Sequence, residues 1–213
     1  MHILITGANR GIGYEIAQRY RAQGHTVTGT ARDDSEVVTL DVTDPEQHQS
    51  MAEQLKSKPV DLLICNAGVY LDKGQGPDGY PAEMWAQTFA ANVTGVFLTV
   101  QALMPNLELA DGARIAIISS QMASHTRAPG GSYIYRASKA AALNLGRNLS
   151  SDLKPNGIAV GIYHPGWVRT DMGGSEGDIS VDEAADGLIA RFAELDIAST
   201  GCFQTWDGRD HAY

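Results

Sequence analysis

The sequence predicts an α/β protein, a single doubly wound domain with a parallel sheet of about seven strands and helices on both faces. Short apolar segments alternate along the chain with longer segments of helical character. The predicted strands at 60–66 and 113–119 are almost continuously apolar, which is typical of strands covered on both faces. The chain has 213 residues and no internal repeat or linker, so we predict one domain over residues 1–213.

Seven strands are predicted, at 2–6, 25–31, 37–40, 60–66, 113–119, 157–163 and 200–206. Their alternation with helices implies right-handed crossover connections, which make neighbouring strands parallel. One connection departs from this pattern. Only Arg32 to Val37 separates the second strand from the third, which is too little chain for a packed crossover helix. We therefore expect a short loop, rather than a helix, at that edge of the sheet.

Five helices are predicted, at 12–23, 45–57, 81–109, 131–153 and 181–195. They fill the intervals between strands and supply the crossovers. Two long loops, at 67–80 and 165–180, follow predicted strands and are rich in Gly and Asp. Loops at the carboxyl ends of parallel strands are where substrates bind in this architecture, so we expect the functional site there.

Composition excludes several classes of function. The net charge is -9 and the pI is about 5.0, which disfavours a nucleic-acid-binding protein because such proteins need a basic surface. The two cysteines, Cys65 and Cys202, form neither a metal-binding spacing nor a disulfide framework. We see no leader-like segment and none approaching the length of a membrane span. We therefore predict a cytoplasmic protein with no metal, no membrane and no nucleic-acid partner.

A strand, a glycine turn and a helix start follow one another near the N-terminus. The turn reads Gly7-Ala8-Asn9-Arg10-Gly11-Ile12-Gly13. Glycines let the backbone turn tightly and let a ligand approach it closely. The free N–H groups of the helix N-terminus can then hold a pyrophosphate. The spacing differs from the usual G-x-G-x-x-G fingerprint. Even so, we favour a phosphate-binding turn over a purely structural one.

The end of the second strand indicates which nucleotide binds. An acidic residue there would bind a free ribose 2′-hydroxyl, whereas an arginine accommodates a 2′-phosphate. Here the strand ends in Arg32, and Arg10 in the glycine turn adds a second cation. NADP(H) is therefore predicted in preference to NAD(H). Asp33 and Asp34 could weaken such a phosphate site, and Arg32 could instead face solvent.

Tyr135 and Lys139 are the clearest candidates for acid–base chemistry. Residues four apart on a helix share one face and can touch. A free phenol titrates near ~10, and a neighbouring cation lowers its pKa by stabilising the phenolate. The pair can therefore act as a general acid or base. Taken alone, such a pair could equally be a solvated helix face.

Seven motifs stand in order along the chain: Thr6 to Gly13, Leu40-Asp41-Val42, Asn66-Ala67-Gly68, Asn92-Val93-Thr94-Gly95, Ile118-Ser119-Ser120, Tyr135 to Lys139, and Pro165 to Thr170. In this order and spacing, they resemble the short-chain dehydrogenase/reductase family along nearly the whole chain. The segments Gly130 to Ala141 and His164 to Met172 are similar to the C-factor-like branch of that family. The resemblance implies a Rossmann fold and hydride transfer with a nicotinamide cofactor.

The resemblance also implies a role for each catalytic residue. Tyr135 would exchange a proton with the substrate oxygen. Lys139 would hold the nicotinamide ribose and lower the Tyr135 pKa. Ser120 would hydrogen-bond the carbonyl oxygen, and Asn92 would position a water that links Lys139 to solvent. This division of work fits the chemistry, since reduction of a carbonyl builds negative charge on oxygen that two hydroxyl groups can stabilise.

The cofactor-binding residues implied by the resemblance are Gly7, Asn9, Arg10, Gly11, Ile12, Gly13, Arg32, Asp41, Val42, Asn66, Ala67, Gly68, Tyr135, Lys139, Pro165, Gly166, Val168 and Thr170. Asp41 and Val42 would contact the adenine, while the motif at 66–68 would pack beside the adenosine ribose. Val168 and Thr170 would orient the nicotinamide amide. Asp41 could instead be a turn residue, and Thr170 a helix cap.

The catalytic serine departs from the family pattern. Counting back from Tyr135 at the usual family spacing lands on Met122, which cannot donate a hydrogen bond. We place the serine at Ser120, directly after an apolar strand, with Ser119 and Ser124 as alternatives. Similarly, Tyr133 is the alternative to Tyr135, although it lacks a lysine four residues later.

The predicted substrate contacts are Met122 and Trp167, with Tyr70 and His125 on loops that face the same region. Ordinary loop packing is the alternative for each. Apolar and aromatic side chains with polar edges suit a medium-sized aldehyde or ketone. The chain is too short for the extra substrate domain of a sugar-nucleotide epimerase.

We therefore predict an oxidoreductase that transfers hydride between NADP(H) and a small-molecule carbonyl or alcohol substrate. The alternative is a cofactor-binding signalling or regulatory protein of C-factor type with little or no turnover. By resemblance, we also expect a homodimer or homotetramer that pairs through the helices at 81–109 and 131–153.

Overall fold

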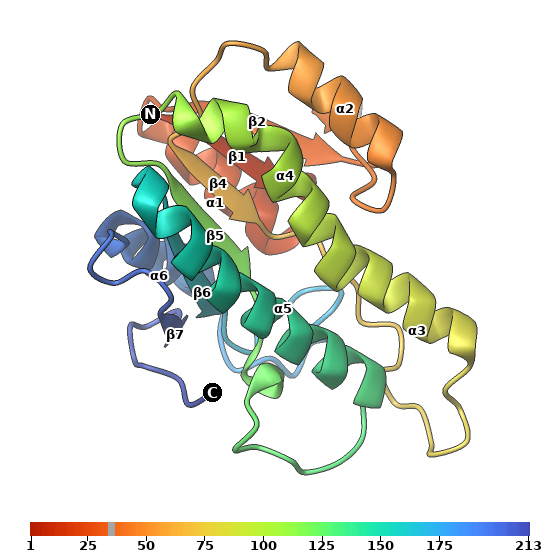
Figure 1. Ribbon diagram of the computed structural model, residues 1–213. Coiled ribbons are helices and arrows are strands. Elements are labelled where there is room, and N and C mark those ends of the chain that lie inside the picture. The colour runs from red at the N-terminus through yellow and green to blue at the C-terminus, as the bar shows by residue number, and fades with distance from the viewer. Residues whose placement is uncertain (34–36) are drawn as a thin grey trace.

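The computed structural model describes residues 1–33 and 37–213. Its sheet has seven strands in the order β3-β2-β1-β4-β5-β6-β7, and every neighbouring pair is parallel. The strands are β1 His2–Thr6, β2 Thr26–Ala31, β3 Val38–Thr39, β4 Leu62–Cys65, β5 Arg114–Ile118, β6 Ala159–His164 and β7 Phe203–Thr205. The predicted doubly wound fold is therefore confirmed (Figure 1).

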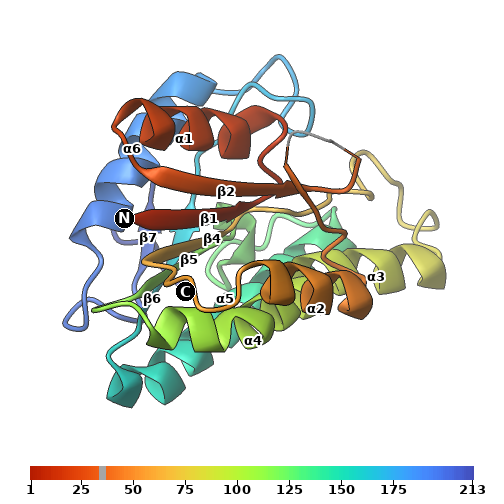
Figure 2. The ribbon, with the colours of Figure 1, turned by 90° about the horizontal axis from the view of Figure 1, so that it is seen from above.

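Six α-helices flank the sheet: α1 Gly11–Ala22, α2 Pro45–Gln54, α3 Ala82–Phe89, α4 Gly95–Glu108, α5 Tyr133–Leu153 and α6 Val181–Glu194. Figure 2 shows α1 and α6 on one face of the sheet and α2, α4 and α5 on the other. As predicted, β2 pairs directly with β3, and the described residues between them form no helix. Residues 34–36 of that connection, including Asp34, lie outside the described residues.

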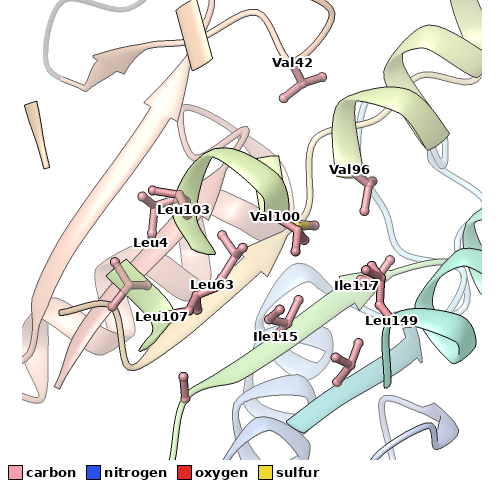
Figure 3. Packing of buried hydrophobic residues seen from close by; sticks show 14 of the residues in the cluster. Leu4, Val42, Leu63, Val96, Val100, Leu103, Leu107, Ile115, Ile117 and Leu149 are labelled. Carbon is pink, nitrogen blue, oxygen red and sulfur yellow. The ribbon is translucent and has the colours of Figure 1, made fainter. Parts of the chain in front are cut away.

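Each face of the sheet has its own buried apolar core. On the face covered by α2, α4 and α5, Leu4, Leu63 and Ile115 from the sheet pack with Val100 and Leu103 from α4 (Figure 3). A second cluster lies between the opposite face of the sheet and the helices α1 and α6. These two layers hold the strands rigidly, so the loops at the strand ends have a fixed base.

Local capping explains where two of the helices begin. The Asp44 carboxylate accepts the backbone N–H of Glu46 at 2.9 Å, just before α2. Ser180 and Glu183 form a reciprocal capping box at the start of α6. In contrast, α5 has no local side-chain cap, because Ser132 at its N-cap is left-handed (φ 47°) and makes no capping hydrogen bond. The partner for this helix start comes from elsewhere in the chain.

The helix predicted at 81–109 is interrupted. Between α3 and α4 the chain forms a π-helical turn at Ala90–Thr94, which contains Asn92. Single π turns occur most often at functional sites. The whole helical run Ala82–Glu108 has 27 residues and is long and apolar enough to cross a membrane by length and composition. Our expectation that no segment approaches that length was therefore wrong. A buried core helix passes the same test, and α4 supplies much of the first core.

The ends of the strands gather the candidate residues. The loops that follow β4, β5 and β6 lie at one end of the sheet, in the lower half of Figure 1. β1 lies between β2 and β4. The order in which successive strands are added to the sheet therefore reverses at β1, next to the glycine turn. Ligands bind at such a switch point in open α/β sheets.

Candidate active site

The glycine turn is tight and leaves a helix start open. Gly7 and Gly11 have positive φ angles of 66° and 56°, which an L-residue with a side chain rarely adopts. A Cβ on Gly13 would lie 2.3 Å from the Gly7 carbonyl oxygen, so only glycine fits there. Arg10 at the N-cap of α1 makes no side-chain capping hydrogen bond. The first-turn N–H groups of α1 are thus available to an anion.

Thr6 and Asn66 tie this turn to β4. The Thr6 hydroxyl oxygen accepts the backbone N–H groups of Asn66 and Ala67, both at 3.0 Å. The Asn66 side-chain amide donates to the carbonyl oxygens of Thr6 and Gly7, also at 3.0 Å. The motif predicted to pack beside the adenosine ribose therefore also fixes the shape of the phosphate-binding turn.

A matched pair of threonines tests this clamp. Thr6 and Thr30 face each other in register on β1 and β2, and both are buried. The Thr30 hydroxyl has no hydrogen-bond partner among the described residues. We expect Thr6→Val to lower the free energy of unfolding by about 2 kcal/mol, because the Ala67 N–H loses its acceptor and the Asn66 N–H keeps only the Ile64 carbonyl oxygen. Thr30→Val should leave it unchanged or raise it. Urea unfolding measures both, and equal losses in the two variants would contradict the clamp.

The predicted adenosine end contains Arg32, Asp41 and Val42. Arg32 is exposed. Burial raises the pKa of Asp41, but hydrogen bonds from Thr43 and the positive charge of Arg32 outweigh this and hold the pKa below its ordinary value. The Asp41 carboxylate accepts the backbone N–H of Thr43 at 2.9 Å, so the turn alternative describes part of its role. Val42 is buried and packs against Gly95. A Cβ added to Gly95 would lie 2.7 Å from the Val42 carbonyl oxygen.

Tyr135 and Lys139 are buried side by side on α5, with side chains only 7% and 6% exposed. The Lys139 Nζ lies 5.7 Å from the centroid of the Tyr135 ring and donates to the Ile118 carbonyl oxygen at 2.9 Å. The alternative of a solvated helix face is therefore wrong. The pair faces the carboxyl end of β5, where the backbone turns toward Ser120.

The acid–base behaviour of Tyr135 differs from the expectation. Burial raises the pKa of Tyr135 above its ordinary value, the charges of Tyr70 and Asp72 raise it further, and a hydrogen bond with Ser120 lowers it. Burial also lowers the pKa of Lys139 from 10.5 to about 8. The sequence suggested a phenol already activated by a full lysine charge. In the structure, desolvation of both groups is the larger effect.

The structure separates Ser120 from its two alternatives. The Ser120 hydroxyl lies close enough to the Tyr135 phenol to lower the pKa of that phenol, and its oxygen also accepts the Met122 N–H at 3.1 Å. The Ser119 hydroxyl instead donates to the Lys139 carbonyl oxygen at 3.2 Å. Ser124 lies farther along the loop and bonds to Thr126. A short 3-10 helix at Gln121–Ala123 follows Ser120 and accounts for the altered spacing from the serine to Tyr135.

Asn92 joins the π turn to the catalytic helix. Its side-chain amide nitrogen donates to the Val69 carbonyl oxygen at 2.9 Å and to the Ser138 hydroxyl at 3.0 Å. Its side-chain oxygen accepts the Val69 N–H at 2.8 Å. A Cβ on Gly68 would lie 3.0 Å from that oxygen and 3.5 Å from the Lys139 Nζ. Gly68 thus lets Asn92 and Lys139 come together.

The loop after β6 lies over the glycine turn. An added Cβ on Gly11 would contact the Thr170 methyl group at 3.7 Å, and Arg10 forms an exposed ion pair with Asp171 at 3.1 Å. Thr170 accepts the Gly173 N–H at 3.0 Å, so it also holds its own loop together. Val168 is buried. The segments predicted to hold the pyrophosphate and the nicotinamide are thus adjacent.

The remaining predicted residues also lie at this end of the sheet. Gly166 has a φ of 91°, and an added Cβ would lie 2.5 Å from Ile179. Trp167 is 45% exposed and donates its indole N–H to the Gly173 carbonyl oxygen at 2.9 Å. Met122 is half-buried on the loop after β5, two residues after Ser120.

In the loop after β4, sequence reasoning missed Asp72 and placed Tyr70 only among the residues that face the substrate. Asp72 is completely buried, and its carboxylate accepts the backbone N–H of Ile134 at 2.9 Å and that of Tyr135 at 3.3 Å. It therefore supplies the cap that α5 lacks locally. The Tyr70 ring stacks on the Tyr135 ring with centroids 4.1 Å apart. Its hydroxyl group bonds to the Ser132 hydroxyl at 2.5 Å.

The lowered pKa of Lys139 predicts a pH dependence of stability. Below about pH 8 the lysine is protonated in both states, so the folded state carries the full cost of a buried charge. Between about pH 8 and 10.5 only the folded state has lost the proton, so stability rises with pH. Lys139→Met removes this cost and should be more stable than the wild type at pH 7, by roughly 2–3 kcal/mol.

Chemical denaturation of both proteins across this pH range measures the difference between their free energies of unfolding. The contributions of the other titrating groups cancel in this difference because both proteins contain them. The advantage of Lys139→Met should shrink steadily above pH 8. A constant difference across the range would show that the folded-state lysine titrates at its ordinary pKa.

Comparisons with known proteins agree with this geometry. A family model described as short chain dehydrogenase matches residues 1–179. The C-signal protein of Myxococcus xanthus is 35% identical over 164 residues, which cover 76% of this chain and 98% of that protein. A 1-hydroxy-2-glutathionyl-2-methyl-3-butene dehydrogenase of Rhodococcus sp. (strain AD45) is 31% identical over 223 residues, covering 97% of this chain and 96% of the relative.

Among solved structures, the NADPH-bound carbonyl reductase from chicken fatty liver matches with a TM-score of 0.91 and 30% identity, covering 100% of this chain and 98% of the other. The similarity to C-signal confirms the predicted C-factor-like branch. The chain therefore belongs to the short chain dehydrogenase family of oxidoreductases.

Proposed function

We propose that this protein is an NADP(H)-dependent carbonyl reductase that interconverts an aldehyde or ketone and its alcohol, with residues 1–213 forming one nucleotide-binding and catalytic domain. One observation carries the proposal. The buried phenol of Tyr135 lies between a hydroxyl donor, Ser120, and a buried lysine, Lys139, beside an open helix start. Binding alone does not need two hydroxyl groups directed at one point.

The glycine turn fits a dinucleotide on its own geometry. It combines positive φ angles, a helix start without a side-chain cap and a position next to the reversal of strand order. Arg32 and Arg10 are both exposed and would hold the 2′-phosphate, although Arg10 also pairs with Asp171. The NADPH bound to the chicken carbonyl reductase supports the same choice of cofactor.

The bound nucleotide would supply the hydride, and the protein supplies the rest. In the direction of reduction, Tyr135 donates its proton to the carbonyl oxygen as negative charge develops there. Ser120 donates a second hydrogen bond to that oxygen. Lys139, held near Asn92 and the Ile118 carbonyl oxygen, would hold the nicotinamide ribose and resupply the proton to Tyr135.

A direct experiment tests this function. The purified protein is titrated with NADPH by fluorescence and then assayed with a panel of uncharged aldehydes and ketones by NADPH absorbance. We expect nucleotide binding and turnover of at least some carbonyl compounds. A folded protein that binds no nicotinamide nucleotide would contradict the proposal.

Arg32 provides a test of nucleotide preference. Its exposed guanidinium lies near enough to Asp41 to affect the pKa of that carboxylate. We expect Arg32→Glu to raise the KM for NADPH about tenfold or more and to lower that for NADH, because an acid repels the 2′-phosphate and accepts a 2′-hydroxyl. Lys154→Glu makes the same change of charge at the opposite end of α5 and should alter neither value. An unchanged preference in Arg32→Glu would place the 2′-phosphate elsewhere.

The similarity to C-signal favours a second candidate, a nucleotide-binding signalling protein with little or no turnover. Tight NADPH binding with no turnover across the carbonyl panel would support it. The Ser120, Tyr135 and Lys139 arrangement favours catalysis. The cytoplasmic location and the homodimer or homotetramer stay predictions.

A further inference from the structure

A cavity of about 460 Å³ opens beside the loop that follows Ser120. It lies at the carboxyl ends of β5, β6 and β7, between the loops that follow these strands. Gln121, the residue after Ser120, lines one side, and Trp167, a predicted substrate contact, lines another. The cavity is within the size range of small-molecule sites.

The C-terminal segment forms the outer wall of this cavity. After β7 the chain turns back, and the His211 N–H donates to the Phe203 carbonyl oxygen at 2.8 Å. The segment thereby covers the exposed edge of β7 and places Arg209 and His211 along the cavity. The His211 ring packs on Phe203 with centroids 4.7 Å apart, which holds the wall in place.

A buried histidine in the cavity wall has an unused nitrogen. His164, the last residue of β6, is 8% exposed and lines the cavity. Its Nδ1 has no hydrogen-bond partner among residues 1–33 and 37–213. A buried polar atom without a partner is costly and therefore marks a place where a ligand or water would bind.

The charges around His164 are mainly positive. Burial and the positive charges of His211, Arg127 and Arg209 together lower the pKa of His164 to about 4, against an opposing effect of Asp207, so the ring is neutral at pH 7. Arg209 is paired with Asp207 at 2.8 Å. The Arg127 guanidinium donates to the Gln121 side-chain oxygen and has no carboxylate partner in the described part of the chain.

Two carboxylates also line the cavity. The Asp210 carboxylate accepts a hydrogen bond from the Gln204 side chain at 3.2 Å, while Asp178 lies on the loop after β6. Neither is among the charges that act on His164. Asp207 does act on it but is paired with Arg209, whereas Arg127 has no carboxylate partner among the described residues. The side of the cavity formed by Arg127 and His164 therefore favours an anion.

We propose that this cavity binds a carboxylate at the remote end of the carbonyl substrate, with Arg127 as its charged partner and His164 as a neutral donor. The preferred substrate class is then an oxo acid, an aldehyde or ketone that carries its carboxylate several bonds from the carbonyl group. This inference rests on the proposed function. A guanidinium is suited to this role because it binds carboxylates with two parallel hydrogen bonds.

The test compares ω-oxo carboxylic acids of increasing chain length with their methyl esters, using NADPH absorbance. The esters keep the aldehyde and the chain but lack the charge. We expect kcat/KM for the acid to exceed that for the ester at one preferred length. Arg127→Gln should lower the ratio of acid to ester by about tenfold or more, since hydrogen bonds to charged groups contribute ~1.5–3 kcal/mol. His164→Gln should lower it less, because the position keeps a neutral donor.

Arg21→Gln is the matched control. Arg21 is exposed on α1, far from the cavity in the fold, and its loss should leave the ratio unchanged. Equal kcat/KM for acid and ester at every length would overturn the inference, and so would a ratio that Arg127→Gln leaves intact. If the esters are turned over and the acids are not preferred, only the carboxylate site is contradicted, and the proposed function stands. Absence of turnover with both series contradicts the proposed function as well.

Discussion

Tyr135→Phe is expected to lower kcat by about 10³-fold or more while leaving the affinity for NADPH close to that of the wild type. The substitution removes only a hydroxyl group, and the remaining ring can still stack on Tyr70 at the 4.1 Å spacing of the native pair. Tyr135 is buried, and its hydroxyl lies close enough to Ser120 for that residue to lower its pKa. Without it, charge that develops on the substrate oxygen would be met by Ser120 alone.

Tyr133→Phe is the matched control for this experiment. Tyr133 lies two residues earlier on the same helix, is 47% exposed and packs against Tyr80 rather than against the catalytic residues. Steady-state turnover of an aldehyde and fluorescence titration with NADPH should show loss of kcat in Tyr135→Phe only. Normal turnover in Tyr135→Phe would require another proton donor. A parallel loss of nucleotide affinity would instead indicate that the phenol mainly holds the cofactor.

The fold could be predicted because its signals are local. Apolar runs such as 113–119 must be covered on both faces, and that requirement alone implies a parallel sheet with helices on both sides. The strand edges moved by at most three residues, and by one residue at each end of β5 at Arg114–Ile118. The π turn at Ala90–Thr94 was missed because it continues the helical periodicity without a glycine or proline break. The helix predicted at 81–109 already had the length of the run Ala82–Glu108, and only its apolar character was underestimated.

The candidate site was predictable where neighbours in sequence are neighbours in space. Tyr135 and Lys139 are one helical turn apart, and Ser120 directly follows a strand, so local spacing is enough to find them. The ionisation of Tyr135 was not predictable, because it depends on burial and on charges brought in from the loop after β4. Asp72 was missed for a related reason. It caps a helix that begins about 60 residues later, and no pattern in the sequence reports such a distance.

Asp72 is a positioning residue for Tyr135. Its carboxylate is buried and accepts the first N–H groups of α5. Burial raises the pKa of the Tyr135 phenol, and the negative charge of Asp72 raises it further. A carboxylate at a helix N-terminus is stabilised by the helix dipole. The same group thus fixes where α5 begins, and with it the position of the Tyr135 hydroxyl relative to Ser120.

Asp72→Ala is therefore expected to lower the free energy of unfolding by about 3 kcal/mol, because two buried N–H groups lose their acceptor. Asp72→Asn keeps one oxygen acceptor but removes the charge, so its loss of stability should be smaller. Removal of the charge lowers the pKa of Tyr135, since the negative carboxylate raises it. In alcohol oxidation Tyr135 must accept a proton, so the pH–rate profile of Asp72→Asn should shift to lower pH.

Asp78→Asn removes an exposed carboxylate from the same loop and should change neither stability nor the pH profile. Urea unfolding and pH–rate measurements on the three variants separate the two roles. A purely structural cap would reduce stability without moving the profile, whereas a positioning residue that also acts on the phenol moves both. An Asp72→Asn profile that coincides with that of the wild type would show that the loop after β4 orders α5 without acting on the ionisation of Tyr135.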